Sequence, residues 1–121
     1  MYMIVGIDHV EISVKNFEQT IEFYKKLGFK QTSIFKKEGR IVQIQLSNDK
    51  LSLDLVKAPE GEEPKLEHIA FLVDDVDKTV AEMKKLGIAI TLEPITSERS
   101  GRRLAAFKDI DGILHQLAKP E

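Results

Sequence analysis

The strongest constraint on the fold is an internal repeat. Shifted by 59 positions, the segment from His9 to Phe29 aligns with the segment from His68 to Ile88. The identical pairs, seven of the 21, are His9/His68, Val14/Val73, Thr20/Thr79, Lys25/Lys84, Lys26/Lys85, Leu27/Leu86 and Gly28/Gly87. The repeat predicts two structural modules of the same kind.

Each copy of the repeat predicts an amphipathic helix. Asn16 and Asp75 are suitable N-caps, and Gly28 and Gly87 stand where a helix ends in a left-handed residue. The apolar stripes at helical spacing are Phe17, Ile21, Tyr24 and Leu27, and then Val76, Val80, Met83 and Leu86. One apolar stripe in each half indicates a helix that uses one of its faces to pack on a sheet.

The strand before each helix alternates between two faces. Val10, Ile12 and Val14 share the face expected under the first helix, while His9 lies on the other face. The second copy repeats this alternation around His68. Both histidines are therefore predicted to point away from the helix of their own half.

Three further strands are expected after each helix. They are residues 30–35, 41–47 and 51–56 in the first half, and residues 89–94, 104–107 and 114–118 in the second. The segment "KAPEGEEPK" is the linker, about residues 57–65, between module 1 (about 4–57) and module 2 (about 66–119). The prediction is an α+β fold with one domain over residues 1–121, in which two tandem βαβββ modules enclose a cleft.

Composition excludes several classes of function. The net charge of −2 gives no electrostatic reason to expect nucleic acid or an anionic membrane as partner. No secretory leader and no run of 18 apolar residues is visible, so we expect a cytoplasmic protein outside the membrane. Because the chain has no cysteine, disulfides and thiolate ligands are excluded, and any metal must be held by nitrogen and oxygen.

The repeat also brings chemical groups into related positions. The segment from Leu51 to Lys57 aligns with that from Ile113 to Lys119, which sets Asp54 opposite Gln116. Together with the two aligned histidines, four groups able to bind a metal occupy corresponding places in the two halves: His9, Asp54, His68 and Gln116. Such a set suits divalent zinc, nickel, cobalt, manganese or iron.

At this point the chain resembles the vicinal oxygen chelate superfamily, which includes glyoxalase I, bleomycin-resistance proteins, methylmalonyl-CoA epimerase and extradiol dioxygenases. The resemblance is carried by "IDHVEISVKNFEQTIEFYKKLGF", by "EHIAFLVDDVDKTVAEMKKLG", and by "GRRLAAFKDIDGILHQL", which is similar to the family ending F-x-D-P-D-G-x-x-x-E-L. It implies one divalent metal ion held by the first and fourth strands of each module, at His9, Asp54, His68 and Gln116. It also implies a small-molecule substrate and a homodimer.

Two departures from the family pattern concern its chemistry. Glyoxalase I usually has glutamates on the two fourth strands, where this chain has Asp54 and Gln116. The resemblance implies a metal-dependent lyase or isomerase of glyoxalase type, which polarises a carbonyl of a small oxo-compound or its thiol adduct. The alternatives are an enzyme similar to methylmalonyl-CoA epimerase, favoured by "GRRLAAF", and a protein that binds an antibiotic without catalysis. An iron dioxygenase normally keeps a glutamate at the position of Gln116.

Other polar residues are candidates for contact with the substrate. Glu11 shares the face of His9, where it can act as a general base, and the alternative is an exposed surface glutamate. Gln43 and Gln45 are expected on the same face. Arg102 and Arg103 can clamp a carboxylate, a phosphate or a coenzyme tail, and the alternative is a solvated turn. His115 has the opposite parity to Gln116 and is excluded from the site.

Overall fold

The computed structural model describes residues 3–120, which form two compact units. The first unit is His9–Glu67, and the second unit joins residues 3–8 to residues 68–120. The order of elements is β-α-β-β-β followed by β-α-β-β-β, which confirms the predicted α+β class and the duplicated module. Within the described residues, no helix has both the length and the apolar character that crossing a membrane requires.

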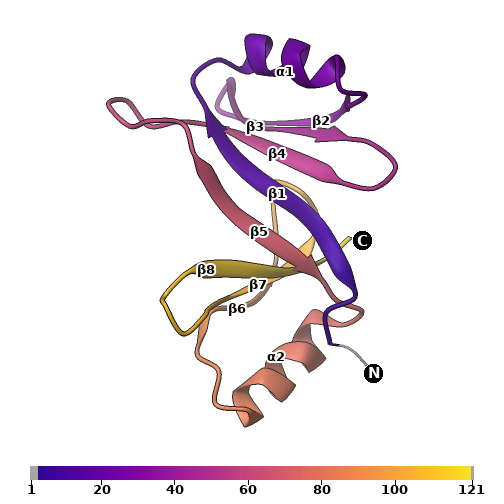
Figure 1. The fold of residues 1–121 in the computed structure, drawn as a ribbon, viewed down its shortest axis with the longest axis vertical. Coiled ribbons are helices and arrows are strands. Elements are labelled where there is room, and N and C mark those ends of the chain that lie inside the picture. Colours follow the sequence, from indigo (N-terminus) through magenta and orange to yellow (C-terminus); the bar gives the residue numbers. More distant parts are fainter. Residues whose placement is uncertain (1–2, 121) are drawn as a thin grey trace. The chain divides into compact units, whose positions relative to one another are not determined.

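The first unit is a helix packed on a sheet. Its elements are β1 (Gly6–Val14, which enters the unit at His9), α1 (Phe17–Lys25), β2 (Lys30–Lys37), β3 (Arg40–Ser47) and β4 (Ser52–Lys57). The strands are ordered β2-β3-β4-β1, with β1 parallel to β4 and the other neighbours antiparallel. Figure 1 shows α1 beside the strands of its own unit.

The core of the first unit lies between α1 and one face of this sheet. Buried Val14, Ile44 and Leu55 are packed against side chains of α1 that include Phe17 and Ile21. The helix begins where predicted, because the side chain of Asn16 accepts a hydrogen bond of 2.9 Å from the backbone N–H of Gln19. The apolar residues of β1 within this unit therefore lie under the helix, and His9, Glu11 and Ser13 lie on the opposite face.

The second unit repeats the arrangement. Its elements are β5 (Leu66–Leu72, which starts in the first unit), α2 (Val76–Lys85), β6 (Ile90–Thr96), β7 (Arg103–Lys108) and β8 (Leu114–Lys119). The strand order is β5-β8-β7-β6, with β5 parallel to β8. Its core joins Val80 and Met83 of α2 to Val73 and to Leu117 of β8, and Asp75 caps the helix as predicted.

Several strands extend beyond their expected ends. The expected strand 30–35 continues through Lys37 because Glu38 and Gly39 have φ values of 53° and 77°, as in a two-residue type I′ hairpin. Lys37 then pairs directly with Arg40. Side-chain alternation could not reveal this extension, because backbone pairing at the end of a hairpin depends on the turn rather than on apolar side chains.

Candidate functional site

The face of the first unit opposite α1 is polar, and strand register aligns its residues. Glu11 of β1 lies opposite Asp54 of β4, Asp54 lies opposite Gln45 of β3, and Gln45 lies opposite Ser33 of β2. Since paired residues of neighbouring strands share a face, four strands contribute to one polar row. We call this surface of the first unit the polar face. It places three predicted site residues, Glu11, Gln45 and Asp54, side by side.

His9 and Asp54 form the centre of the polar face. Each is 2% exposed, and His9 Nε2 lies 3.7 Å from Asp54 Oδ2. This separation is too long for a good hydrogen bond. Two ligand atoms about 2.1 Å from a tetrahedral metal ion lie about 3.4 Å apart, so the spacing suits two donors to one ion.

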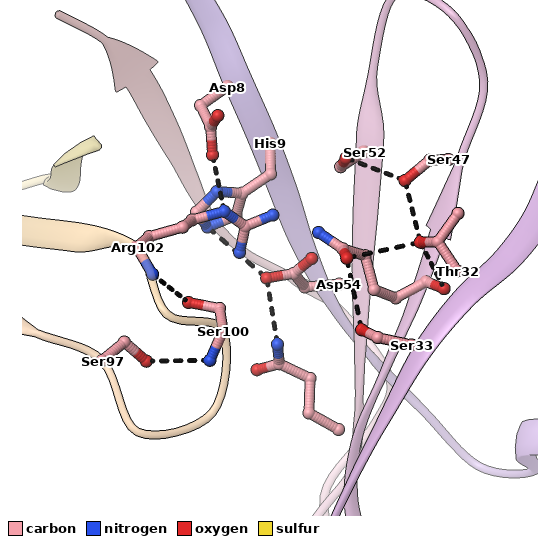
Figure 2. A network of polar contacts seen from close by, with 12 residues as sticks. Asp8, His9, Thr32, Ser33, Ser47, Ser52, Asp54, Ser97, Ser100 and Arg102 are labelled. Atoms are coloured by element: carbon pink, nitrogen blue, oxygen red, sulfur yellow. Dashed lines mark hydrogen bonds and ion pairs between the residues drawn. The ribbon is translucent and has the colours of Figure 1, made fainter. Parts of the chain in front are cut away.

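The two glutamines of β3 have different partners. Gln43 is buried and donates a hydrogen bond of 3.2 Å from Nε2 to Asp54 Oδ2. Gln45 Oε1 instead accepts hydrogen bonds from the hydroxyls of Thr32 and Ser33, at 3.3 and 3.2 Å. Figure 2 shows Asp54 with His9 on one side of this network and the hydroxyls of β2 and β3 on the other. Both glutamines lie on the predicted face, and their contact with substrate stays a prediction.

His68 and Gln116 occupy the corresponding face of the second unit. Gln116 of β8 lies opposite Ala70 of β5, and His68 precedes Ala70 by two residues, so both side chains point to one side. Phe71 and Leu117 have the opposite parity and belong to the core under α2. The amide oxygen of Gln116 is buried and has no hydrogen-bond partner within residues 3–120. A buried acceptor without a donor is costly, and a cation is one group that satisfies it.

The donor chemistry fits a divalent ion, although each unit supplies only two of the four predicted ligands. Within residues 3–120, no three side chains of His, Cys, Asp and Glu gather closely enough to hold a metal ion. The first unit supplies His9 and Asp54, and the second supplies His68 and Gln116. Two imidazoles, a carboxylate and an amide oxygen are all ligands that first-row divalent metals accept.

Arg102 is a buried residue rather than an exposed clamp. Its Nε atom lies 2.8 Å from Asp8 Oδ2, and the two side chains are 5% and 8% exposed. The loop before it is hydrogen-bonded, since the N–H of Ser97 donates to the carbonyl of Arg102 and the N–H of Ser100 donates to Ser97 Oγ. Figure 2 shows Ser97, Ser100 and Arg102 in this loop. The loop therefore holds the guanidinium against Asp8.

Arg103 points to a different neighbour. Its Nε and Nη2 atoms donate hydrogen bonds of 3.0 and 2.8 Å to the two oxygens of Asp77 in the first turn of α2. These bonds lower the pKa of the Asp77 carboxyl and raise the pKa of the Arg103 guanidinium. The guanidinium of Arg103 is thus hydrogen-bonded to a carboxylate on the surface of α2. Anion binding by Arg102 or Arg103 stays a prediction.

His115 lies on the face of β8 that carries the core, as its parity predicts. Its ring is 5.4 Å from the ring of Phe71 and 5.5 Å from that of Phe107, and its Nε2 lies 3.4 Å from Asp109 Oδ2. Asp109 also accepts backbone hydrogen bonds from Ile113 and Asp111. This histidine of β8 therefore packs against the two phenylalanine rings and contacts the preceding turn at Asp109.

Asp109 gives a prediction for the dependence of stability on pH. Its pKa is lowered first by the N–H of Ile113, then by the N–H of Asp111 and by His115. A carboxyl with a lowered folded-state pKa stabilises the fold above its unfolded value, about 3.9, and this contribution is lost as the pH falls through the folded pKa. Asp109→Ala should therefore destabilise the protein at neutral pH and have little effect in strong acid.

Urea unfolding of wild type and Asp109→Ala at about pH 7 and about pH 2 measures this difference. Asp111→Ala is the matched control, because it removes a carboxylate from the same turn and keeps the backbone N–H that binds Asp109. A destabilisation by Asp109→Ala that is as large in acid as at neutral pH contradicts the assignment.

Two relationships were not predicted from the sequence. The first is the ion pair between Asp8 and Arg102. Alternation places Asp8 on the side of Val10, and a buried acid among apolar residues requires a partner. This requirement was the one sequence signal that could have indicated a buried cation such as Arg102. The hydrogen bond from Gln43 to Asp54 had no sequence signal. It depends on the register between β3 and β4, whereas alternation predicts only the face of a residue.

Known proteins are similar to this chain in sequence or in fold. The chain is 31% identical to the uncharacterized protein YwkD of Bacillus subtilis (strain 168) over 122 residues, which cover 92% of this chain and 94% of that protein. Methylmalonyl-CoA epimerase from Mycobacterium tuberculosis superposes with a TM-score of 0.83 at 19% identity, over 100% of this chain and 91% of that chain. A variant of the Streptomyces coelicolor methylmalonyl-CoA epimerase, in complex with 2-nitronate-propionyl-CoA, gives a TM-score of 0.77 at 24% identity, over 97% and 98% of the two chains.

The family follows from a match over nearly the whole chain. The model of the Glyoxalase/Bleomycin resistance protein/Dioxygenase superfamily matches residues 6–117. This range includes every predicted ligand and all the helices and strands of both βαβββ modules except the last two residues of β8. The chain therefore belongs to the glyoxalase/bleomycin resistance protein/dioxygenase superfamily, which confirms the resemblance found in its sequence.

Proposed function

We propose that the protein is a metal-dependent enzyme that moves a proton on the carbon next to a carbonyl, with an acyl thioester of the methylmalonyl-CoA type as substrate. The observation that carries the proposal is the buried pair of His9 and Asp54, spaced 3.7 Å apart like two ligands of one ion. The fold shared with methylmalonyl-CoA epimerases supports the epimerase reading over the glyoxalase reading.

Four residues would hold the metal under this proposal. They are His9 and Asp54 of the first unit and His68 and Gln116 of the second. When bound, a divalent ion supplies Lewis-acid polarisation of the substrate carbonyl, which makes the neighbouring carbon more acidic. The buried amide oxygen of Gln116, which has no hydrogen-bond partner within residues 3–120, supports its place in this set.

Glu11 is proposed as the base. It lies directly opposite Asp54 on the polar face, and it is the candidate carboxylate that is not assigned as a ligand. A carboxylate in this position would accept the proton from one face of the substrate carbon, and water or a second group would return a proton to the opposite face to complete an epimerisation. Its neighbours His9 and Asp54 are buried and Glu11 itself is half-buried, so the base would be partly shielded from water.

Substrate contacts are proposed for the remaining candidates. Gln45 and Arg103 are accessible enough to meet a ligand, since Arg103 has a side chain that is 40% exposed. Gln43 and Arg102 are buried against Asp54 and Asp8 and would meet a ligand only at its innermost part. We also propose a homodimer and a cytoplasmic location.

A second function is favoured by the amide at position 116. Epimerisation is served best by two acid-base groups on opposite faces of the carbon, whereas a proton shift between neighbouring carbons needs one base. With Gln116 in place of a glutamate, Glu11 is the base that remains among the candidate residues. A glyoxalase-type isomerisation of a thiol adduct is therefore the second candidate.

The test measures metal content first and proton exchange second. We expect about one divalent ion per chain in protein purified without chelator or soaked with metal. Exchange of the substrate α-proton with deuterated water, followed by NMR, should occur with methylmalonyl-CoA and fall about 10²–10⁴-fold in Glu11→Gln. Exchange on the hemithioacetal of methylglyoxal alone would support the second candidate. Protein that binds no metal would contradict both and leave a binding protein without catalysis.

A further inference from the structure

We infer that Gln43 is a positioning residue, which sets the affinity for the metal by fixing the orientation of Asp54 without binding the ion itself. The inference rests on the metal site of the proposed function. It assigns Gln43 a different task from contact with substrate. Its physical basis is one hydrogen bond between two buried side chains on adjacent strands.

The donor and the acceptor of this bond are fixed by chemistry. The NH₂ group of Gln43 donates and the side-chain oxygen of Asp54 accepts, as the chemistry of an amide nitrogen requires. Nε2 of Gln43 lies 3.2 Å from Oδ2 of Asp54, the same oxygen that lies 3.7 Å from His9 Nε2. The amide thus restrains a carboxylate oxygen that lies near the imidazole.

Burial makes this restraint effective. Gln43 is 6% exposed, and both His9 and Asp54 are 2% exposed. A buried hydrogen bond to a charged group contributes more than an exposed one, because water does not compete for the carboxylate. If the amide is removed, Asp54 loses a buried hydrogen bond that restrains its carboxylate.

A neutral donor is the suitable group beside a cation site. A lysine or arginine at this position would orient Asp54 equally well, but its positive charge would repel the metal. A glutamate would add negative charge and has no N–H to donate. The amide of Gln43 orients the carboxylate and leaves the charge of the site unchanged, as partners of metal ligands commonly do.

Gln45 provides a matched comparison on the same strand. It has the same side chain and lies on the same face two residues away. Its amide oxygen is bonded to Thr32 and Ser33 rather than to Asp54. If any glutamine on the polar face supported metal binding, substitution of Gln43 and of Gln45 would weaken metal affinity equally. Because only Gln43 is bonded to Asp54, we expect the two substitutions to have different effects.

The test is a double-mutant cycle between Gln43 and Asp54. Affinity for Co²⁺ and Zn²⁺ is measured by competition with a chromophoric chelator in wild type, Gln43→Leu, Asp54→Ala and the double variant. Gln43→Leu should weaken binding about 10–100-fold in the wild-type background. In the Asp54→Ala background the same substitution should change affinity less than about 2-fold, because the residue it acts through is absent. Gln45→Leu should leave the affinity unchanged.

Two further readouts separate positioning from folding. The midpoint of thermal unfolding of the metal-free proteins reports any general loss of structure, and Gln43→Met replaces Gln43→Leu if that variant does not fold. The Co²⁺ absorption spectrum should change in Gln43→Leu and stay constant in Gln45→Leu, since only the first alters the ligand geometry.

The outcomes distinguish this inference from the proposed function. An equal loss of affinity in both backgrounds, or an equal loss for Gln43→Leu and Gln45→Leu, overturns the role of Gln43 and leaves the metal enzyme intact. A wild-type protein that binds neither ion overturns both. A loss confined to Gln43 and dependent on Asp54 supports the inference even if neither substrate of the proposed function is turned over.

Discussion

His9→Ala and His68→Ala are each expected to weaken binding of a divalent ion at least about 100-fold, since loss of a ligand should exceed the 10–100-fold loss caused by removing a ligand's partner. His9 is buried beside Asp54, and His68 lies on the corresponding face of the second unit. The measurement is metal stoichiometry and affinity in protein purified without chelator. Proton exchange on the thioester should fall with the loss of metal.

The chain supplies its own control for this prediction. His115 is the third of the three histidines and contacts Phe71, Phe107 and Asp109 on the side of α2. His115→Ala is expected to retain the stoichiometry of metal binding, whatever its effect on stability. If His115→Ala loses metal to the same extent as His9→Ala, the histidines act through general folding and the assigned ligands are wrong.

Asp8→Ala is expected to lower the free energy of unfolding by about 3–5 kcal/mol, the usual cost of removing one partner from a buried ion pair. The carboxylate of Asp8 contacts the guanidinium of Arg102 at 2.8 Å, and both side chains are nearly inaccessible to water. Its removal takes away a counter-charge where solvent cannot replace it. Urea unfolding of the metal-free variant and wild type at one pH measures the loss.

Asp77→Ala is the matched control for Asp8→Ala. Asp77 pairs with the adjacent arginine, Arg103, at the same distance of 2.8 Å, but this pair lies on the surface. Exposed ion pairs contribute little because water and salt screen them. We therefore expect a small change for Asp77→Ala, and similar losses for the two variants would show that burial does not distinguish the two pairs.

The repeated module can be predicted from the sequence because the same pattern of residues occurs in both halves. Each copy has its own aligned histidine. Each copy also has its own N-cap, Asn16 or Asp75, and its own glycine after the helix, which follow from the local requirements of helix ends. Gly28 and Gly87 have φ values of 98° and 82°, as their positions predict. Agreement between two copies is what makes these local signals specific.

The partners of individual side chains could not be predicted from the sequence. Alternation along a strand gives the face of Gln43, but only the register of neighbouring strands brings its amide to Asp54 rather than to a hydroxyl. Two adjacent arginines in one loop look equivalent in the sequence. In the structure Arg102 is buried on Asp8, and Arg103 pairs with a residue 26 positions earlier in the chain. Such choices depend on long-range packing that a pattern of residue types does not encode.

The strands that open the two modules each change units along their length. Residues 6–8 of β1 belong with the second unit, while Leu66 and Glu67 of β5 belong with the first. A cut in the linker would therefore give two fragments that each carry a piece of the other's compact unit. The duplicated halves of the sequence therefore do not coincide with the compact units of the structure, and we expect each half expressed alone to be less stable than the whole chain.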